Sequence, residues 1–467
     1  MAKGRKEMTM WFERVLFKRV EVWLVLLLLV LVLPGIVLFG EIVKSEAVSR
    51  QYPDRPSRWG TIGDAAYFVA DLPEVLKSAM ETGSAFHAGS ARRLADIPSG
   101  WSQVSDGTAL SGYLLFSRID GDLGRTVVEL VDLSDFSVLH RWLPAPETLF
   151  AGLPRTSKIV PYAFWSSARF RAMHPLLEAD GSLVMHGQTS PLMRLSPCGD
   201  MLWMQDDIML HHSLNRDAEG NYWSPGFTEP TELGLSEKFH DDTLVQISPE
   251  GEILFTRSLT QLLIDHGHEY MVYQMGEYRE DPLHLNDIQP VLSDGPYWKT
   301  GDLLISARDI AAILLYRPST DEILWMKRGP WMAQHDVDIL GPTTISVFNN
   351  NVRNRGAGAY IDTTSNVLVY DLESDTVTSP YQSALEEAVV LATTNGLSDM
   401  TESGHLIVEE DTAGRLLVFG PDRALAWQYM NRDAAGTPYR MAWSRYVPKA
   451  LGDQARAALA AASCPAP

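Results

Sequence analysis

Residues 301–325 read GDLLISARDIAAILLYRPSTDEILW, and this stretch decides the fold class. Its three short runs of aliphatic and β-branched residues are separated by turn-forming Asp, Pro and Ser residues, which is typical of three consecutive antiparallel strands. The same phrase, in which a turn leads into apolar strands that close on an aromatic residue, recurs along the chain. The other copies begin at Gly112, Gly181, Gly220, Thr344 and Gly404.

The tandem copies predict an all-β chain with the architecture of a six-bladed β-propeller. Copies of three or four short strands at intervals of roughly 40–80 residues match the blades of a propeller, whose sheets stack radially and bury their faces against each other. A β-sandwich is the alternative. It has no physical reason to repeat one strand, turn and aromatic phrase in tandem.

The texture of the sequence changes near residue 100 and divides the chain. We expect the propeller to occupy residues 101–447. Before it, residues 44–100 form a stalk and lead-in segment, in which residues 62–82 have the three- and four-residue apolar spacing of a helix. After it, residues 448–467 form a tail with a short Ala-rich helix at 451–462.

The N-terminus predicts a membrane anchor at residues 22–43. Its uncharged core, Val22 to Gly40, holds 19 residues and reaches roughly 28 Å as a helix, close to the thickness of a hydrocarbon core. Residues 1–21 are basic, so the positive-inside rule places them in the cytoplasm and the propeller in the periplasm, on a single-pass inner-membrane protein. A cleavable signal peptide is the alternative. Its apolar region is normally shorter and ends in a small-x-small site, whereas residues 41–44 read EIVK.

Charge and composition restrict the partners. The formal net charge is −20, with 59 Asp and Glu against 39 Lys and Arg, so a nucleic acid would be repelled and is not expected as a partner. A small anion is still compatible with this balance, because a local group of Arg and His can reverse the field inside one cleft. The sequence leaves the oligomeric state open, with a homodimer as one alternative.

Two cysteines, Cys198 and Cys464, stand far apart in the sequence. A disulfide between them is possible, but nothing in the sequence supports it. An exported chain with a core of this size does not need one.

Histidines stand a few residues ahead of the first strand of several copies: His174, the pair His211 and His212, His284, and His335. The innermost strand of each blade lines the central channel of a propeller, so we expect these imidazoles to face one common space. For any single histidine, the alternative is a side chain that caps a turn or packs into a wall. Recurrence at one position of the repeat favours a shared role.

The phrases around these histidines resemble the motifs of bacterial arylsulfotransferases. They are HHSLNRDAEGNYW at 211–223, HLNDI at 284–288, LLISAR at 303–308 and QHDVDI at 334–339. Members of that family are six-bladed propellers that move a sulfuryl group from an aryl sulfate to a phenol without a nucleotide-sulfate donor. The resemblance covers approximately residues 170–430 and implies that the propeller is a catalytic domain.

The resemblance implies a double displacement with named roles. His335 would be the nucleophile that becomes sulfated, while Arg308, His284 and one of His211 and His212 would surround the sulfate. His212 is favoured over His211, because both His212 and His335 are followed by one residue and then an aliphatic residue. Imidazole and guanidinium suit this chemistry, since a loose transition state needs positioned donors more than a strong base.

Three further residues are expected to bind substrate: His211, Asn286 and His174. No cofactor or metal is expected, because no HExxH-type or similarly close spacing of ligands occurs and Arg308 would disfavour a cation. The alternative function is a non-catalytic, membrane-anchored propeller that acts as a scaffold or ligand sensor. The interval from Arg308 to His335 is short for the family, so we expect trimmed loops and a different acceptor pocket, with the natural donor and acceptor left open.

Overall fold

The computed structural model divides into two compact units, residues 1–83 and 84–467, which are described separately. The described residues run from 21 to 464 apart from short segments at 52–56, 83–91, 107–108, 155–164, 168, 229–232, 234, 237, 275, 277 and 356–358. Residues 1–20 of the predicted basic segment therefore lie outside the described residues.

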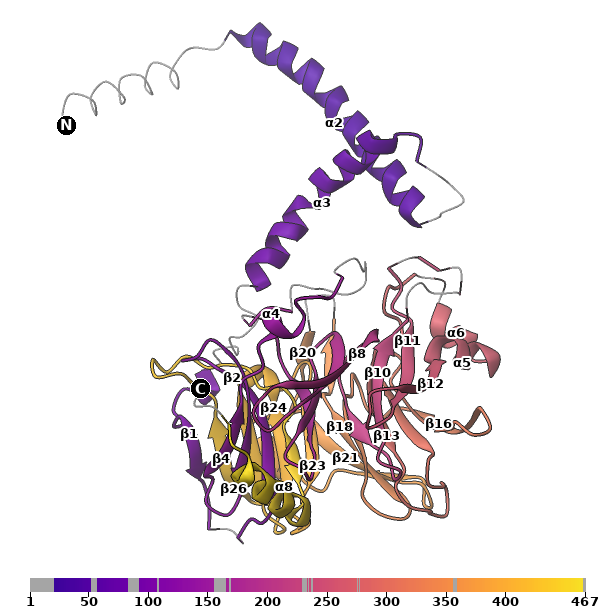
Figure 1. The fold of residues 1–467 in the computed structure, drawn as a ribbon. Helices are drawn as coiled ribbons and strands as arrows, with labels where there is room; N and C mark the ends of the chain where they lie inside the picture. The colour runs from indigo at the N-terminus through magenta and orange to yellow at the C-terminus, as the bar shows by residue number, and fades with distance from the viewer. Residues whose placement is uncertain are drawn as a thin grey trace, which may run out of the picture. The chain divides into compact units, whose positions relative to one another are not determined.

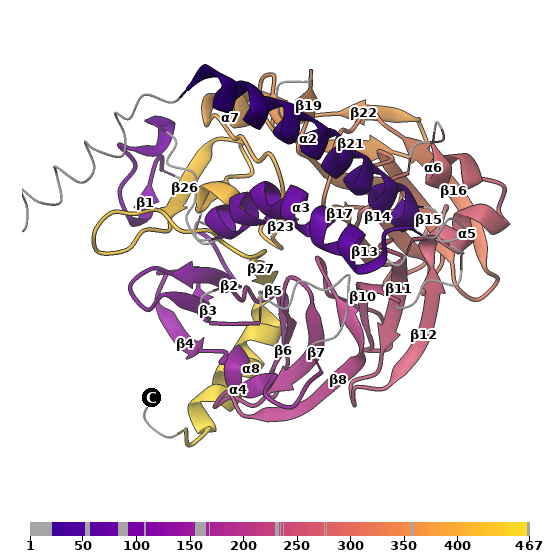
Figure 2. The same cartoon turned by 90° about the horizontal axis from the view of Figure 1, so that it is seen from above.

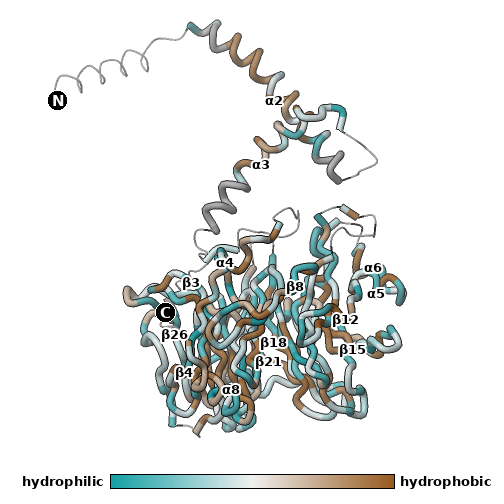
Figure 3. The backbone as a smooth tube through the Cα atoms, viewed as in Figure 1, coloured by the Kyte–Doolittle hydropathy of each residue, from teal (hydrophilic) through white to brown (hydrophobic). Residues whose placement is uncertain are grey.

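The first unit consists of two helices, α2 (Val22–Gln51) and α3 (Gly60–Thr82). Within α2 the run Leu26–Glu46, 21 residues long, is apolar enough to cross a membrane, and Figure 3 marks much of it as hydrophobic. Its length corresponds to about 32 Å, which fits a hydrocarbon core. A signal sequence has the same properties, so the retained anchor, its membrane and its orientation stay predictions. The helix expected at 62–82 is present as α3.

The stretch at 301–325 folds into three antiparallel strands, as predicted: β14 (Leu303–Ala307), β15 (Ala312–Arg317) and β16 (Glu322–Arg328). β13 (Leu285–Pro290) pairs with β14 and completes a four-stranded sheet. β14 and β15 are buried on both faces, whereas β16 alternates between exposed and half-buried residues. This gradient is expected when a sheet is packed between two neighbours and only its outer strand meets solvent.

The described residues of the second unit form a propeller-like ring of sheets (Figures 1 and 2). Another four-stranded sheet consists of β17 (Val337–Ile339), β18 (Thr344–Asn349), β21 (Asn366–Asp371) and β22 (Thr376–Thr378). The eight-stranded sheet consists of β5 (Met173–Leu177), β6 (Leu183–His186), β7 (Ser190–Leu195), β8 (Met201–Leu210), β9 (Asn215–Arg216), β10 (Tyr222–Phe227), β11 (Asp242–Ile247) and β12 (Ile253–Ser258).

Strands from both ends of the second unit pair with each other and close the ring. A four-stranded sheet joins β27 (Arg445–Val447) to β2 (Tyr113–Asp120), β3 (Arg125–Asp132) and β4 (Val138–Trp142). A five-stranded sheet joins β1 (Gly100–Gln103) to β26 (Leu425–Met430), β25 (Arg415–Phe419), β24 (Leu406–Glu410) and β23 (Leu397–Met400). A separate hairpin is formed by β19 (Val352–Asn354) and β20 (Ala359–Ile361). Because one sheet holds eight strands, the number of sheets does not give the number of blades. The predicted six blades therefore stay a prediction.

The core lies between neighbouring sheets as separate apolar clusters. One cluster packs Trp142, Phe150 and Trp165 between the sheet of β2 to β4 and the start of the eight-stranded sheet. The recurrent turn glycines have a conformational reason: Gly220 and Gly301 have φ of 92° and 89°, a region that side chains with a Cβ rarely adopt. The short helices outside the ring strands are α4 (Pro146–Leu149), α5 (Leu259–Asp265), α6 (Glu269–Tyr273), α7 (Gln382–Glu387), η1 (Arg92–Leu94) and η3 (Asp411–Ala413).

The C-terminal helix is α8 (Lys449–Ala461), where the sequence predicted a helix at 451–462. Its buried residues Ala455 and Leu459 pack into the same cluster as Trp142. Beyond α8, Cys464 forms a disulfide with Cys198. The sequence left this pairing open, because a separation of 266 residues hides a contact that α8 creates by folding back onto the ring.

Candidate active site

The predicted histidines lie where the chain enters the first strand of each sheet unit. His174 is in β5, His212 lies between β8 and β9, and His284 directly precedes β13. All three have positive φ, of 43°, 60° and 54°. Left-handed backbone at a residue other than Gly is uncommon and clusters at functional sites. The repeated conformation turns successive side chains in the same sense.

Three of the predicted imidazoles lie together. The ring centroid of His212 is 5.2 Å from that of His284 and 6.2 Å from that of His335. His211 contacts His212 with a centroid distance of 5.0 Å but stacks on Phe227 at 4.2 Å. Of the pair, His212 is therefore the one that contacts the other two imidazoles.

His174 is separated from this group by Trp443. The fully buried Trp443 ring lies 5.7 Å from the His174 ring and 5.9 Å and 6.1 Å from those of His212 and His335. Among the described residues, no ring contact joins His174 to the other imidazoles. His174 lines a different cavity, of about 450 Å³.

His335 is a neutral imidazole whose two nitrogens both have partners. The amide of Asn350 donates to the carbonyls of Ala392 and Asn395, at 2.8 Å and 2.6 Å, so its Oδ1 faces Nδ1 of His335, 2.7 Å away, and accepts a proton from it. Nε2 accepts the backbone N–H of Asn395 at 3.0 Å. Burial and the nearby charge of Arg308 lower the pKa of His335 to about 3.

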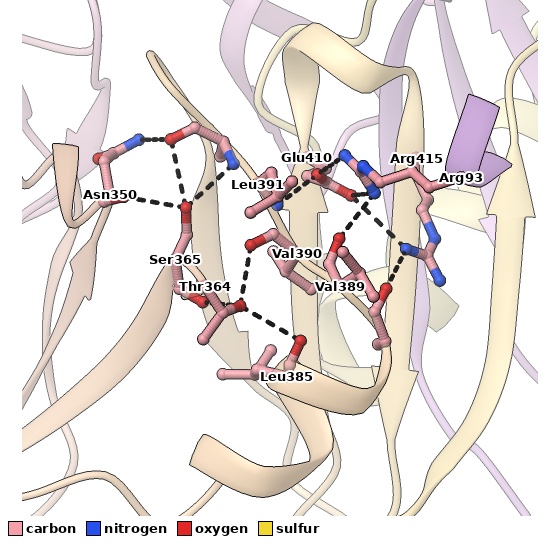
Figure 4. A network of polar contacts seen from close by, with 12 residues as sticks. Arg93, Asn350, Thr364, Ser365, Leu385, Val389, Val390, Leu391, Glu410 and Arg415 are labelled. Carbon is pink, nitrogen blue, oxygen red and sulfur yellow. Dashed lines mark hydrogen bonds and ion pairs between the residues drawn. The ribbon is translucent and has the colours of Figure 1, made fainter. Parts of the chain in front are cut away.

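Asn350 is itself held in a polar network (Figure 4). Ser365 donates to the Asn350 carbonyl and accepts the N–H of Ala392, both at 3.0 Å. In the same segment, the N–H of Leu391 donates to the buried Glu410 at 2.7 Å. Two guanidinium groups pair with that carboxylate: Arg93 and Arg415. The segment behind His335 is thus fixed by hydrogen bonds on both sides, and these orient the imidazole.

His284 is paired with a carboxylate instead. Nδ1 of His284 donates to Oδ2 of Asp281, and the backbone N–H of His284 donates to Oδ1 at 3.0 Å. Burial by itself would lower the pKa of His284, but the hydrogen bond and charge of Asp281 outweigh it and raise this pKa above its ordinary value. His240 lies behind the same carboxylate, with Nδ1 3.8 Å from Oδ2.

His211 and His212 share a proton. Their Nδ1 atoms are 2.7 Å apart, a distance that needs one proton between them. Nε2 of His211 is 3.2 Å from Oδ1 of the buried Asp242, whose other oxygen accepts the N–H of Leu285 at 2.8 Å. Burial and the neighbouring imidazoles lower the pKa of His212 well below its ordinary value. His212 is therefore neutral at physiological pH.

Arg308 follows β14 and lies beside the imidazoles. Its backbone N–H donates to the carbonyl of His284 at 3.0 Å, and its guanidinium donates to Asp309 at 2.6 Å. The Arg308 charge contributes a lowering to the pKa of both His284 and His335, although the pKa of His284 is raised in total. Its buried Nε has no hydrogen-bond partner among the described residues. This N–H is therefore a donor that no described residue uses.

Asn286 is fully buried in the wall of the site. Its amide donates to the carbonyl of Gln334 at 2.9 Å, directly before His335, so it braces the strand that carries this histidine. Contact of Asn286 or His174 with a substrate stays a prediction.

A cavity of about 180 Å³ opens beside this group. Its lining includes His211, His212, His284, Phe227 and His240. A closed apolar cavity of about 150 Å³ accommodates benzene, so this one has room for a single aromatic ring. His335 does not line it and is fully buried behind the other imidazoles.

Comparison with known proteins follows this geometry. A sequence model of the family described as Arylsulfotransferase (ASST) matches residues 176–432, more than half of the 467-residue chain. The chain belongs to the arylsulfotransferase family. All four phrases quoted from the sequence, at 211–223, 284–288, 303–308 and 334–339, lie inside the match. No curated protein matches the chain.

The solved structures that match the chain are distant in sequence. A protein of unknown function from Bacteroides caccae is 10% identical, covers 72% of this chain and 99% of its own, and has a TM-score of 0.46. A virginiamycin B lyase from Staphylococcus aureus is 11% identical, covers 57% of this chain and 72% of its own, and has a TM-score of 0.32. A catalytically inactive form of the virginiamycin B lyase from that organism, with quinupristin, is 11% identical. It covers 74% of this chain and 98% of its own, and has a TM-score of 0.36.

Sequence reasoning missed the partners that orient the imidazoles of this arylsulfotransferase-family chain. Asp281 stands three residues before His284, a local spacing that could have been noticed. Asn350 lies in a run of three asparagines at 349–351, and Asn is unfavourable in strands, so this run was also a signal. Asp242 and Trp443 gave no signal, because only the fold brings them to the site.

Proposed function

We propose that this chain is an aryl-sulfate sulfotransferase that moves a sulfuryl group from an aryl sulfate to a phenol through a sulfohistidine, without a nucleotide-sulfate donor. Membership of the arylsulfotransferase family supports the reaction class. The observation that carries the proposal is the convergence of His212, His284 and His335, with ring centroids 5.2 Å and 6.2 Å apart, beside Arg308. Positioned donors of this kind are what a loose transition state with dispersed charge requires.

In the first half-reaction, the Nε2 lone pair of His335 attacks the sulfur of the aryl sulfate. The bond between sulfur and the aryl oxygen breaks, and its electron pair leaves on that oxygen. His284 transfers its Nε2 proton to the departing oxygen, so a neutral phenol is released. The Nδ1 proton of His335 stays on its hydrogen bond to Asn350, and the sulfated ring carries one positive charge next to the sulfonate.

In the second half-reaction, the acceptor phenol gives its proton to Nε2 of His284 while its oxygen attacks the sulfur. The bond between nitrogen and sulfur breaks, and the electron pair returns to Nε2 of His335. Arg308 donates to the sulfonate oxygens in both steps. When the shared proton lies on Nδ1 of His211, His212 carries its own proton on Nε2 and donates it to the sulfonate.

The attack needs one local change. Nε2 of His335 accepts the N–H of Asn395 at 3.0 Å, so its lone pair is occupied. The Asn395 amide must release this nitrogen before the sulfur can approach. Giving up this hydrogen bond leaves the buried N–H of Asn395 without a partner and costs about 1–3 kcal/mol, which the contacts of the bound sulfate must offset.

The same proposal includes the architecture around the site. We take the eight-stranded sheet as two blades, because β8 and β10 pair at only two positions, Leu210 with Gly226 and Met209 with Phe227. The cavity of about 450 Å³ is lined by residues of β5, β9, β13, β17, β23 and β27, one strand from each of six blades. The catalytic propeller spans residues 101–447 in the periplasm, and residues 22–43 anchor it in the inner membrane.

The test uses the full-length chain in detergent with a chromogenic aryl sulfate and a phenol. We expect release of the coloured phenol and formation of the new aryl sulfate. His335→Ala abolishes both, whereas the matched control His268→Ala, at the start of α6 away from the imidazole group, leaves them unchanged. Phenol release that survives His335→Ala contradicts the assigned nucleophile.

A second measurement identifies the sulfated residue. After treatment with the donor and no acceptor, peptide mass spectrometry should place one sulfuryl group on the peptide containing His335. A sulfated His212 would instead show that His212, which lines the cavity of about 180 Å³, is the nucleophile. The alternative, a scaffold or sensor propeller, predicts binding of aryl sulfates with neither phenol release nor a sulfated peptide.

A further inference from the structure

Asp281 is engaged with His284 through both of its carboxylate oxygens. Oδ2 accepts the Nδ1 proton, and Oδ1 accepts the backbone N–H of the same residue at 3.0 Å. The Asp281 side chain is 26% exposed and that of His284 is 29% exposed, so water weakens the attraction between their charges only in part. This double contact fixes the ring with Nε2 turned away from the carboxylate. The cavity of about 180 Å³ is lined by both residues.

The imidazoles of the site differ in what their Nδ1 atoms contact. For His335 the partner is the neutral amide of Asn350, at 2.7 Å. For His212 it is another imidazole, that of His211, at 2.7 Å. Of these three rings, His284 alone has a carboxylate at Nδ1 among the described residues, and the negative charge stabilises the imidazolium form more than the neutral Asn350 amide does. The residue types behind the rings therefore separate an imidazole that holds a proton from one that does not.

We propose that Asp281 is a positioning residue that makes His284 the group that delivers and collects the proton during sulfuryl transfer. This inference rests on the proposed function and goes beyond it, because it assigns a role to a residue that acts through His284. His284 in its charged form gives the Nε2 proton to the leaving phenolate oxygen. It becomes neutral and takes the proton of the acceptor phenol in the second half-reaction.

The charged groups around His284 agree with this role. On its own loop it faces Asp281, after β14 it faces Arg308, and at the start of β11 it faces Asp242. His212 lies on the cavity side, with a centroid distance of 5.2 Å. The carboxylates of Asp281 and Asp242 favour the imidazolium and Arg308 opposes it, and the pKa of His284 is raised.

A merely structural role for Asp281 predicts something different. Its contact with the backbone N–H of His284 also shapes the loop before β13, so loss of the side chain could lower all activity equally. A proton donor, by contrast, matters most when the leaving oxygen is a poor leaving group. The dependence on the leaving phenol therefore separates positioning of an acid from support of a loop.

The experiment compares two donors in the full-length chain, with kcat/KM for the donor as the measure of the first half-reaction. One donor is 4-nitrophenyl sulfate, which releases an acidic phenol, and the other is phenyl sulfate, which releases a weakly acidic one. Asp281→Asn should lower kcat/KM for phenyl sulfate on the order of 10²-fold, the usual contribution of a general acid, and that for 4-nitrophenyl sulfate by less than about 5-fold. The matched control Asp265→Asn, a surface carboxylate paired with Arg257, should change neither. Equal losses for both donors would overturn the proposal.

A readout without turnover keeps this inference separate from the proposed function. Diethyl pyrocarbonate modifies neutral imidazole, so the pH midpoint of modification of the His284 peptide reports its protonation. In Asp281→Asn this midpoint should move to lower pH, and an unchanged midpoint would overturn the proposal. If the wild-type chain transfers no sulfuryl group, the proposed function fails, and the midpoint still decides whether Asp281 holds the proton on His284.

Discussion

Acidification from pH 7 to pH 5 should leave the nucleophile almost fully active. His335 has a pKa of about 3, because burial and the charge of Arg308 disfavour its protonated form. At pH 5 about 99% of a group with that pKa is neutral, whereas an ordinary imidazole with a pKa of about 6.5 would be only about 3% neutral. The structure therefore predicts almost no loss where an unperturbed histidine would lose roughly 25-fold.

The assay is the pH profile of kcat/KM for 4-nitrophenyl sulfate, since an acidic leaving phenol makes the proton on His284 least important. Circular dichroism at each pH checks that the chain stays folded. On the alkaline side, phenyl sulfate should show a decline that 4-nitrophenyl sulfate does not. Because the pKa of His284 is raised, this decline lies above the ordinary imidazole range. A fall of roughly 25-fold at pH 5 in a folded chain would refute the neutral, buried nucleophile.

Three further outcomes follow from the geometry. Cys464→Ser removes a disulfide that closes a loop of 266 residues. In a chain-entropy model this bond stabilises the fold by up to about 5 kcal/mol, so the thermal midpoint under oxidising conditions should fall by up to about 6 °C. An unchanged midpoint would show that the bond adds no stability. Arg308→Lys keeps the charge but loses the planar fork, so kcat/KM should drop on the order of 10²-fold for both donors, and retained activity would exclude guanidinium contact with the sulfonate. Arg445→Met leaves four facing carboxylates, Asp287, Asp336, Asp338 and Asp399, without their buried cation, so urea unfolding at pH 7 should show a loss of about 3–5 kcal/mol. That deficit should shrink toward pH 5, because burial raises the pKa of Asp287 to about 6 and protonation removes the repulsion; a deficit that does not depend on pH would contradict this.

The ring of sheets could be predicted because the sequence repeats the chemistry of one blade. The stretch at 301–325 carries its turns and apolar runs in the right order, and it forms β14, β15 and β16. The approximate place of the imidazoles followed from the same repetition, since each lies at the start of a sheet's first strand or a few residues ahead of it. What the repeat could not reveal is how blades join, as in the mixed sheet of β27 with β2, β3 and β4. Such closure pairs residues from opposite ends of the unit, which share no local pattern.

The roles of the histidines were the harder part, and the reason is physical. A repeat makes His174, His212, His284 and His335 equivalent in sequence, but reactivity depends on what stands behind each ring. His174 is separated from the other imidazoles by Trp443. This tryptophan precedes β27, the last strand of the ring. The partners of the other three are a carboxylate, an amide and a second imidazole, contributed by a loop, a strand end and a neighbouring position. These partners interrupt the repeat, and in the proposed mechanism they turn equivalent positions into a proton donor, a neutral nucleophile and an anion-binding wall.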